Sequence, residues 1–312
     1  MHVLTRADAS MRVRTGVALG ALFLGLGAAG CSSSGSTTPA DTGAQQARPL
    51  DGVTYYDPAQ RALLHDATER RVAQCMRTRG FGYRPQPLAA SDHTADGNPY
   101  GLLTPAQARN DGFGLTSSAL DARPFVDANA AADGGQAWKD ALDGTAAHRV
   151  YLAMPGGRQF FYNADACSTQ AVAQVYGADY YRLYETMEVL AGQVVTTVQA
   201  DDGVHAAESR WRSCMAAAGE RSADLDAPLS AVTAQLHTAL ASGDRARVHA
   251  VAGRELSLAE TDAGCQETSG LAAAVATAQA RAEQPVRRSH AADLAALRAL
   301  QRTALSSAAR TG

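Results

Sequence analysis

The chain has 312 residues, of which 46% are hydrophobic when alanine is included, 19% are charged and 6% are aromatic. With a formal net charge of −3 it lacks the basic excess of nucleic-acid-binding proteins, so we expect no nucleic-acid partner. The apolar content is too high for a chain that is disordered throughout. The length suffices for one large or two small domains with a buried core.

The first 31 residues contain the pattern of a bacterial export signal. Arg12 and Arg14 precede an uncharged apolar stretch over residues 16–30, which ends in small residues directly before Cys31. Charged, apolar and small-residue regions in this order are typical of a secretory signal. A cysteine directly after the small residues resembles the lipobox of bacterial lipoproteins, in which the thiol receives diacylglycerol and becomes the first residue of the mature chain.

The apolar stretch is shorter than the roughly 20 residues that a membrane-spanning helix needs. We therefore expect residues 1–30 to be a lipoprotein signal peptide, with the membrane as a partner through lipidated Cys31 at its extracytoplasmic face. An ordinary cleaved signal and an uncleaved anchor helix are the alternatives. Residues 31–49 are rich in Ser, Thr, Gly and Gln, which predicts a flexible tether without buried residues.

Four further cysteines predict two disulfides, since an even number in an exported chain favours pairing. Three pairings are permitted. Cys75 and Cys214 share their surroundings, with Glu six residues before, Met directly after and Gly five residues after. Cys167 and Cys265 each follow an aspartate by two or three residues.

The simplest interpretation is two related units that pair Cys75 with Cys167 and Cys214 with Cys265. A chance likeness in an alanine-rich chain is the alternative. The first unit, residues 50–200, is expected to be loop-rich, and the second unit, residues 201–312, to be helical.

Several short motifs follow one another along residues 55–268. They are Cys75-Met76, Gly80-Phe81-Gly82-Tyr83, Gly112-Phe113-Gly114-Leu115, Cys167, Val175-Tyr176-Gly177, Trp211, Cys214-Met215, Glu255, Asp262 and Cys265. In this order the motifs resemble a group of uncharacterised actinobacterial lipoproteins with paired Cys-Met…Gly and Asp…Cys units. The resemblance implies an exported lipoprotein and carries no reaction or ligand with it.

Apolar spacing, caps and breaker residues predict a mainly α fold, a disulfide-linked helical bundle with a loop-rich N-terminal half. A β-hairpin is expected over Tyr151–Tyr162, around Pro155-Gly156-Gly157. Helices are expected from Asp57-Pro58 to Gly80, from Thr104-Pro105, over Trp138–Leu142, Leu183–Val198, Val204–Cys214 and Pro228–Leu240, from Asp244 to Cys265, and in two last segments separated by Gly270 and Pro285.

Motifs of the common enzyme classes are missing from the sequence. Lys139 is the only lysine and follows no glycine-rich phosphate loop, and Gln136 stands where a Ser-x-x-Lys nucleophile would be. There is no Gly-x-Ser-x-Gly, His-Glu-x-x-His or Cys-x-x-Cys motif. We assign no catalytic residue and no cofactor.

Two patterns of metal-binding residue types are too incomplete to predict a metal site. His237 and His249 lie on neighbouring expected helices without a third ligand, and both are interpreted as solvent-facing. Residues Asp92–Gly97 resemble the opening of a calcium loop, but Leu103 stands where a bidentate Glu is required, which favours a polar turn.

Two groups of residues remain as candidate sites. The carboxylates of Glu69, Glu208, Asp165 and Asp262 recur beside the cysteines, and we interpret them as caps or ion-pair partners of arginines. The rings of Phe81, Tyr83, Tyr100 and Phe113 lie in a Gly-rich stretch and form the candidate ligand-binding group, with a local core as the alternative.

The sequence thus indicates a binding or interaction component of the cell envelope, with an envelope or transporter protein as a possible partner. The alternative is a cell-envelope hydrolase whose site combines acids such as Glu69 and Asp165.

Overall fold

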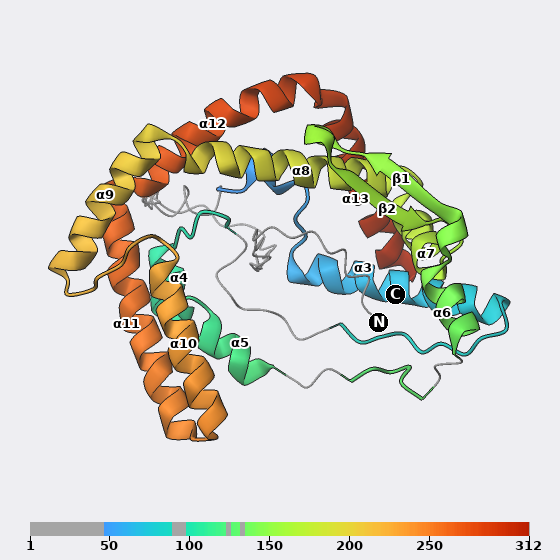
Figure 1. Ribbon diagram of the computed structural model, residues 1–312, viewed down its shortest axis with the longest axis horizontal. Helices are drawn as coiled ribbons and strands as arrows, with labels where there is room; N and C mark the ends of the chain where they lie inside the picture. Colours follow the sequence, from blue (N-terminus) through green and yellow to red (C-terminus); the bar gives the residue numbers. More distant parts are fainter. Residues whose placement is uncertain (1–46, 89–97, 123–125, 132–134, 312) are drawn as a thin grey trace, which may run out of the picture.

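The computed structural model describes residues 47–88, 98–122, 126–131 and 135–311 (Figure 1). The expected signal peptide, Cys31, most of the tether and the Asp92–Gly97 turn lie outside the described residues. Within the described residues, twelve α-helices accompany one two-stranded antiparallel sheet and two disulfides. The prediction of a mainly α, disulfide-linked fold with one β-hairpin is confirmed.

The helices and strands extend from residue 49 to residue 311, and the connections between them are short from residue 135 onward. They are α2 (Pro49–Gly52), α3 (Pro58–Thr78), α4 (Pro105–Asp111), α5 (Leu115–Asp121), α6 (Gln136–Asp143), β1 (Arg149–Ala153), β2 (Gln159–Asn163), α7 (Cys167–Tyr176), α8 (Tyr180–Gln199), α9 (Asp202–Ala217), α10 (Ala227–Ser242), α11 (Arg245–Ser269), α12 (Leu271–Ser289) and α13 (Ala291–Thr311).

Side-chain caps start the helices where the sequence indicated. Asp57 Oδ1 accepts a hydrogen bond from Gln60 N at 2.8 Å, and the Gln60 side chain accepts one from Asp57 N, which completes a capping box before α3. The side chains of Thr104 and Asp244 cap α4 and α11 by accepting hydrogen bonds from backbone N–H groups of the first turn, without the reciprocal bond of a capping box. Local sequence therefore explains these three boundaries.

The predicted break at Pro285 is wrong, because Pro285 lies inside α12 and the break falls at His290. A proline in a helix lacks the N–H that would bond to the carbonyl four residues earlier. Here the cost is outweighed by packing, since Val286 contacts two of the core clusters. Tertiary contacts override the local preference at this position.

The hairpin places one aromatic face on α8. Tyr151 of β1 pairs with Phe161 of β2, so the alternate residues of β2 point to the opposite face of the sheet. There Tyr162 stacks on Tyr181 of α8, with ring centroids 5.2 Å apart, and Phe160 lies 5.5 Å from the same ring. The sheet is thereby fixed to the helical body.

The described helices form an arch (Figure 1). The long helices α8 and α12 pack side by side along its top. At one end α9, α10 and α11 pack together with α4 and α5, and at the other end α3, α6, α7 and α13 lie beside the sheet. Five clusters of buried apolar side chains fill the contacts between these elements.

Packing crosses the expected unit boundary at residue 200, which falls between α8 and α9. The C-terminal helix α13 lies against α3, α7 and α8, while α4 and α5 pack against α11. Each end of the arch therefore combines segments that are far apart in the sequence.

The end of the expected tether is attached to the arch. Ala47 is only 4% exposed, so the expectation that no residue of the tether is buried is wrong at this position. Leu50 and Asp51 both adopt φ +57°, a left-handed conformation that costs free energy outside glycine. Glu283 accepts a hydrogen bond from Leu50 N at 2.8 Å. Arg287 of α12 and Arg298 of α13 both form ion pairs with Asp51. These contacts hold the turn in place.

Candidate functional site

The disulfides join the partners that the two-unit interpretation predicted. Cys75 bonds to Cys167, 92 residues away, and Cys214 bonds to Cys265, 51 residues away. The first bond joins α3 to α7 and the second joins α9 to α11.

The Cys-Met helices also end alike. Phe81 N donates to the Met76 carbonyl at 2.9 Å, and Glu220 N donates to the Met215 carbonyl at 2.8 Å. The glycine before each donor has a positive φ, +82° and +85°, which lets the chain turn back on the last helical turn. Both methionine side chains are fully buried. The repeated residues therefore make the same local structure twice.

The partner cysteines differ in their surroundings. Cys167 opens α7, and Asp165 just before it accepts hydrogen bonds from the backbone and hydroxyl of a loop threonine. Cys265 lies within α11, where buried Asp262 accepts a hydrogen bond from Trp211 Nε1 at 2.8 Å. Burial raises the pKa of Asp262 to about 6. Asp165 thus fixes a loop next to α7, and Asp262 links α11 to α9.

The structure does not gather the four candidate rings in one groove. Phe81 and Tyr83 pack beside Trp138 around the Cys75–Cys167 cluster. Tyr100 and Phe113 are 5% and 3% exposed and belong to two other core clusters. All four rings therefore contribute to local cores.

The candidate catalytic carboxylates also lie in separate networks. Glu69 Oε2 accepts hydrogen bonds from the Tyr83 hydroxyl at 2.9 Å and from Gln86 N at 2.7 Å. Asp165 is held by its loop threonine. Glu69 thus ties the segment after α3 back onto that helix, and no described contact joins it to Asp165.

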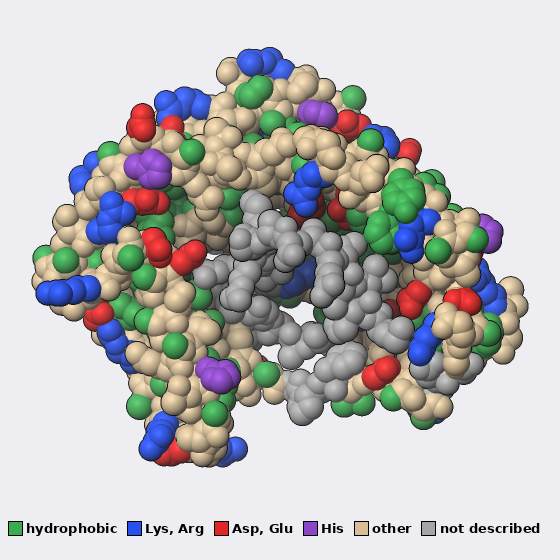
Figure 2. Space-filling view, in the orientation of Figure 1, with side chains coloured by type: hydrophobic (Ala, Val, Ile, Leu, Met, Phe, Trp, Pro, Cys, Tyr) green, Lys and Arg blue, Asp and Glu red, His purple; other side chains and the backbone are tan. Residues whose placement is uncertain are grey.

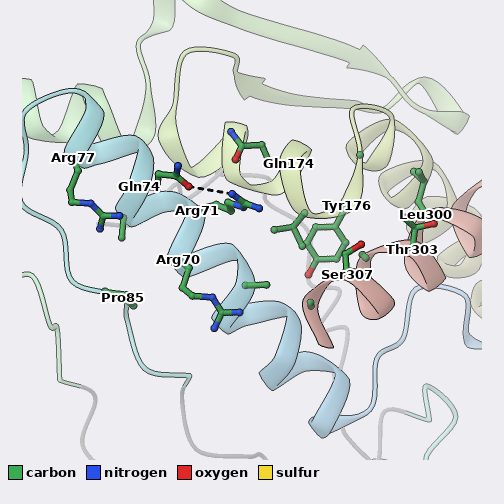
Figure 3. A pocket seen from close by; sticks show the side chains of 16 residues that line it. Arg70, Arg71, Gln74, Arg77, Pro85, Gln174, Tyr176, Leu300, Thr303 and Ser307 are labelled. Atoms are coloured by element: carbon green, nitrogen blue, oxygen red, sulfur yellow. Dashed lines mark hydrogen bonds between the residues drawn. The ribbon is translucent and has the colours of Figure 1, made fainter. Parts of the chain in front are cut away.

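A cleft of about 650 Å³ opens between α3, α7 and α13 (Figure 3). Arg70, Arg71, Gln74 and Arg77 lie along α3 on one side of it, and α7 and α13 form the other side. Its complete lining is Ala67, Arg70, Arg71, Ala73, Gln74, Arg77, Pro85, Gln174, Val175, Tyr176, Gly177, Leu300, Thr303, Ala304, Ser307 and Ala308.

The lining carries positive charge without a compensating acid. It contains three arginines and no Asp or Glu. Arg71 donates to Gln74 Oε1 at 3.2 Å, and none of the three arginines forms an ion pair with a described carboxylate. By contrast, Arg254 and Arg281 each donate to a carboxylate at 2.7 Å or less. The cleft arginines are exposed and available to a ligand.

The surrounding segment is locally basic. Residues 58–88 contain six arginines and two acids, in a chain whose net charge is −3. On the face shown in Figure 2, basic and acidic side chains alternate over the arch without a patch of one sign. Three of these six arginines, Arg70, Arg71 and Arg77, line the cleft.

The far wall supplies hydroxyl and amide groups above an apolar floor. Tyr176 lies where α7 meets α13, with Thr303 and Ser307 next to it (Figure 3). Burial, followed by the influence of a neighbouring tyrosine, raises the pKa of Tyr176 to about 12, so its hydroxyl stays protonated at neutral pH. A Cβ at Gly177 would lie 3.0 Å from Leu300, which shows how closely α7 approaches α13 here.

A smaller hollow of about 420 Å³ lies at the other end of the arch, at the tips of α5, α10 and α11. The apolar side chains of Leu120 and Leu240 are 57% and 47% exposed beside it. His249 also lines it, whereas His237 is exposed elsewhere on α10.

Within the part of the chain that the structure describes, no group of three or more His, Cys, Asp or Glu side chains is arranged to hold a metal ion. In the same residues, every helix is too short or too polar to cross a bilayer.

No protein-family model, curated protein or solved structure matches this chain.

The sequence alone did not indicate the cleft arginines as a candidate site. Arg70 and Arg77 are seven residues apart, which places them on one helix face, but their second wall comes from residues more than 90 positions later.

Proposed function

We propose that the protein is a lipoprotein anchored at the extracytoplasmic face of the cell membrane, and that it serves the envelope by binding an anionic ligand in the cleft between α3, α7 and α13. The pattern around Cys31 supports the anchor, and the two disulfides fit an oxidising compartment. The observation that carries the binding role is a cleft whose lining, among the described residues, contains three arginines and no carboxylate.

Arginine suits this role because its planar guanidinium group donates paired hydrogen bonds to carboxylate or phosphate oxygens. Such charge-assisted bonds are stronger than neutral ones.

Calorimetric titration of the disulfide-bonded protein with pyrophosphate tests the binding role. We expect saturable binding to the wild type, and at least about tenfold weaker binding when Arg70, Arg71 and Arg77 are all replaced by Gln. The matched control replaces Arg221, Arg288 and Arg302, exposed arginines outside the cleft lining, and is expected to bind like the wild type. Equal loss in both triple variants, or no binding to the wild type, would contradict the proposal.

Metabolic labelling with a radioactive fatty acid tests the anchor. The wild type is expected to incorporate label and to sediment with membranes, whereas Cys31→Ala is expected to remain unlabelled and unprocessed at that position. Labelling of Cys31→Ala to the wild-type level would contradict lipidation at this residue.

A further inference from the structure

The cleft arginines are spread along the helix instead of converging on one point. Arg70 and Arg77 are seven residues apart on α3, which corresponds to about 10 Å of helix rise and almost two full turns. They therefore share one face. In Figure 3 their guanidinium groups do not point toward one another, and Arg71 extends beside Gln74 toward α7.

Like charges repel one another, so three guanidinium groups that have no carboxylate partner among the described residues are stabilised when separate anions neutralise them. A single phosphate can accept bonds from one or two arginines, but it leaves the third without a counter-charge. A ligand with several anionic groups in a row satisfies all three at once. The charge pattern of α3 therefore favours an extended ligand over a compact one.

The opposite wall indicates which anionic group suits the cleft. Tyr176 and Ser307 line the side across from the α3 arginines, and Gln174 of α7 also lines the cleft. The two oxygens of a carboxylate lie in one plane and can be satisfied by a single bidentate arginine. A phosphate is tetrahedral, so its oxygens can accept hydrogen bonds from the arginine side and from the hydroxyl side together.

We infer that the ligand is a linear chain carrying repeated phosphate groups, which lies along α3 so that different phosphates of the one chain reach Arg70, Arg71 and Arg77. This inference rests on the proposed function. The chain runs along the cleft with its charged groups toward α3, and its remaining phosphate oxygens accept hydrogen bonds from the side chains of α7 and α13.

Competition titrations with four probes test the inference: orthophosphate, pyrophosphate, a short linear polyphosphate, and polyglutamate of similar charge. We expect polyphosphate to bind at least about tenfold more tightly than orthophosphate per molecule, because its linked groups occupy neighbouring positions together. Its affinity is also expected to fall more steeply with added salt, since more charges are neutralised. Polyglutamate is expected to bind more weakly than polyphosphate.

Single substitutions at the two ends of the arginine row separate a chain from a compact anion. Arg70→Gln and Arg77→Gln are each expected to weaken polyphosphate binding and to leave orthophosphate binding within about twofold, whereas the control Arg288→Gln changes neither. If polyphosphate binds no better than pyrophosphate, or if polyglutamate binds as tightly as polyphosphate, the inference fails while the proposed anion site stands. If no probe binds, both fail.

Discussion

The buried carboxylate of Asp262 shows how one residue couples the second unit to pH. Its Oδ1 accepts hydrogen bonds from Trp211 at 2.8 Å and from Gln266 at 3.0 Å, across the contact between α9 and α11. Burial is the largest influence and raises its pKa to about 6, although both hydrogen bonds act in the opposite direction. Compared with the unfolded chain, the folded protein therefore favours the protonated form of Asp262.

We predict that Asp262→Asn removes a pH dependence of stability. The folded pKa of about 6 exceeds the ordinary value of 3.8, so the stability linked to this group is complete below pH 3.8 and is lost as the pH rises past 6. In the wild type this loss amounts to about 3 kcal/mol, as the difference between the two pKa values implies. Asp262→Asn is expected to show no such loss, because asparagine does not titrate. Urea unfolding from acidic to neutral pH measures it, with the exposed neighbour substitution Glu260→Gln as control. Parallel pH profiles for Asp262→Asn and the wild type would refute the coupling.

A second buried carboxylate holds the loop-rich segment onto the helical body. Glu255 of α11 accepts hydrogen bonds from the backbone N–H groups of Phe113, Leu115 and Thr116 at 2.8–3.1 Å, and also from the Thr116 hydroxyl. A Cβ at Gly112 would lie 2.8 Å from Glu255 Cγ, which leaves no space for a larger residue. The carboxylate thus caps α5 from a distant helix.

We predict that Glu255→Gln lowers the free energy of unfolding by about 3 kcal/mol, because the amide replaces one acceptor oxygen with a donor that faces other donors. Glu267→Gln on the exposed side of α11 is the matched control and is expected to change stability by less than about 0.5 kcal/mol. Denaturant titration measures both variants. Equal stability of the two would show that the Glu255 contacts contribute little.

At the scale of elements, the two Cys-Met helices are equivalent at their ends but act on different partners. The bond from Cys75 fixes α3 to α7, two walls of the cleft, whereas the bond from Cys214 fixes α9 to α11 at the other end of the arch. Both close long loops, and the chain-entropy model assigns roughly 4–5 kcal/mol of stabilisation to each as an upper value.

We predict that the two disulfides have the same effect on stability but different effects on binding. Replacing Cys75 and Cys167 by Ser is expected to weaken pyrophosphate binding by about tenfold, because the two walls are no longer held in the binding geometry. Replacing Cys214 and Cys265 by Ser serves as the matched control and is expected to preserve affinity in the folded protein. Calorimetry below the unfolding transition compares them, and equal affinity in both variants would contradict the role of the first bond.

The sequence predicted those elements whose causes are local. Capping by Asp57, Thr104 and Asp244 sets helix starts, and the repeated residues around the cysteines led to the observed pairing. Pro285 was misjudged because packing of the helix around it outweighs a missing hydrogen bond. Local preferences alone do not contain such tertiary terms.

At the scale of the whole molecule, the cleft exists because α13 returns to lie against α3 and α7. No feature of α3 alone shows that Arg70 and Arg77 face a second wall, since their row is compatible with any exposed helix face. The placement of the candidate rings has a related cause, because Tyr100 and Phe113 are covered by distant helices. The positions of many helices followed from the sequence, but α5 and the continuous α12 did not, and the site depends on how the arch closes.

The most direct test of the central claim is a crystal structure of the protein with pyrophosphate. The account predicts that the anion lies between α3 and α13, within hydrogen-bond distance of at least two of Arg70, Arg71 and Arg77. Pyrophosphate bound only elsewhere, such as in the smaller hollow, whose lining includes Arg245, with the α3 cleft empty at saturating concentration, would contradict it.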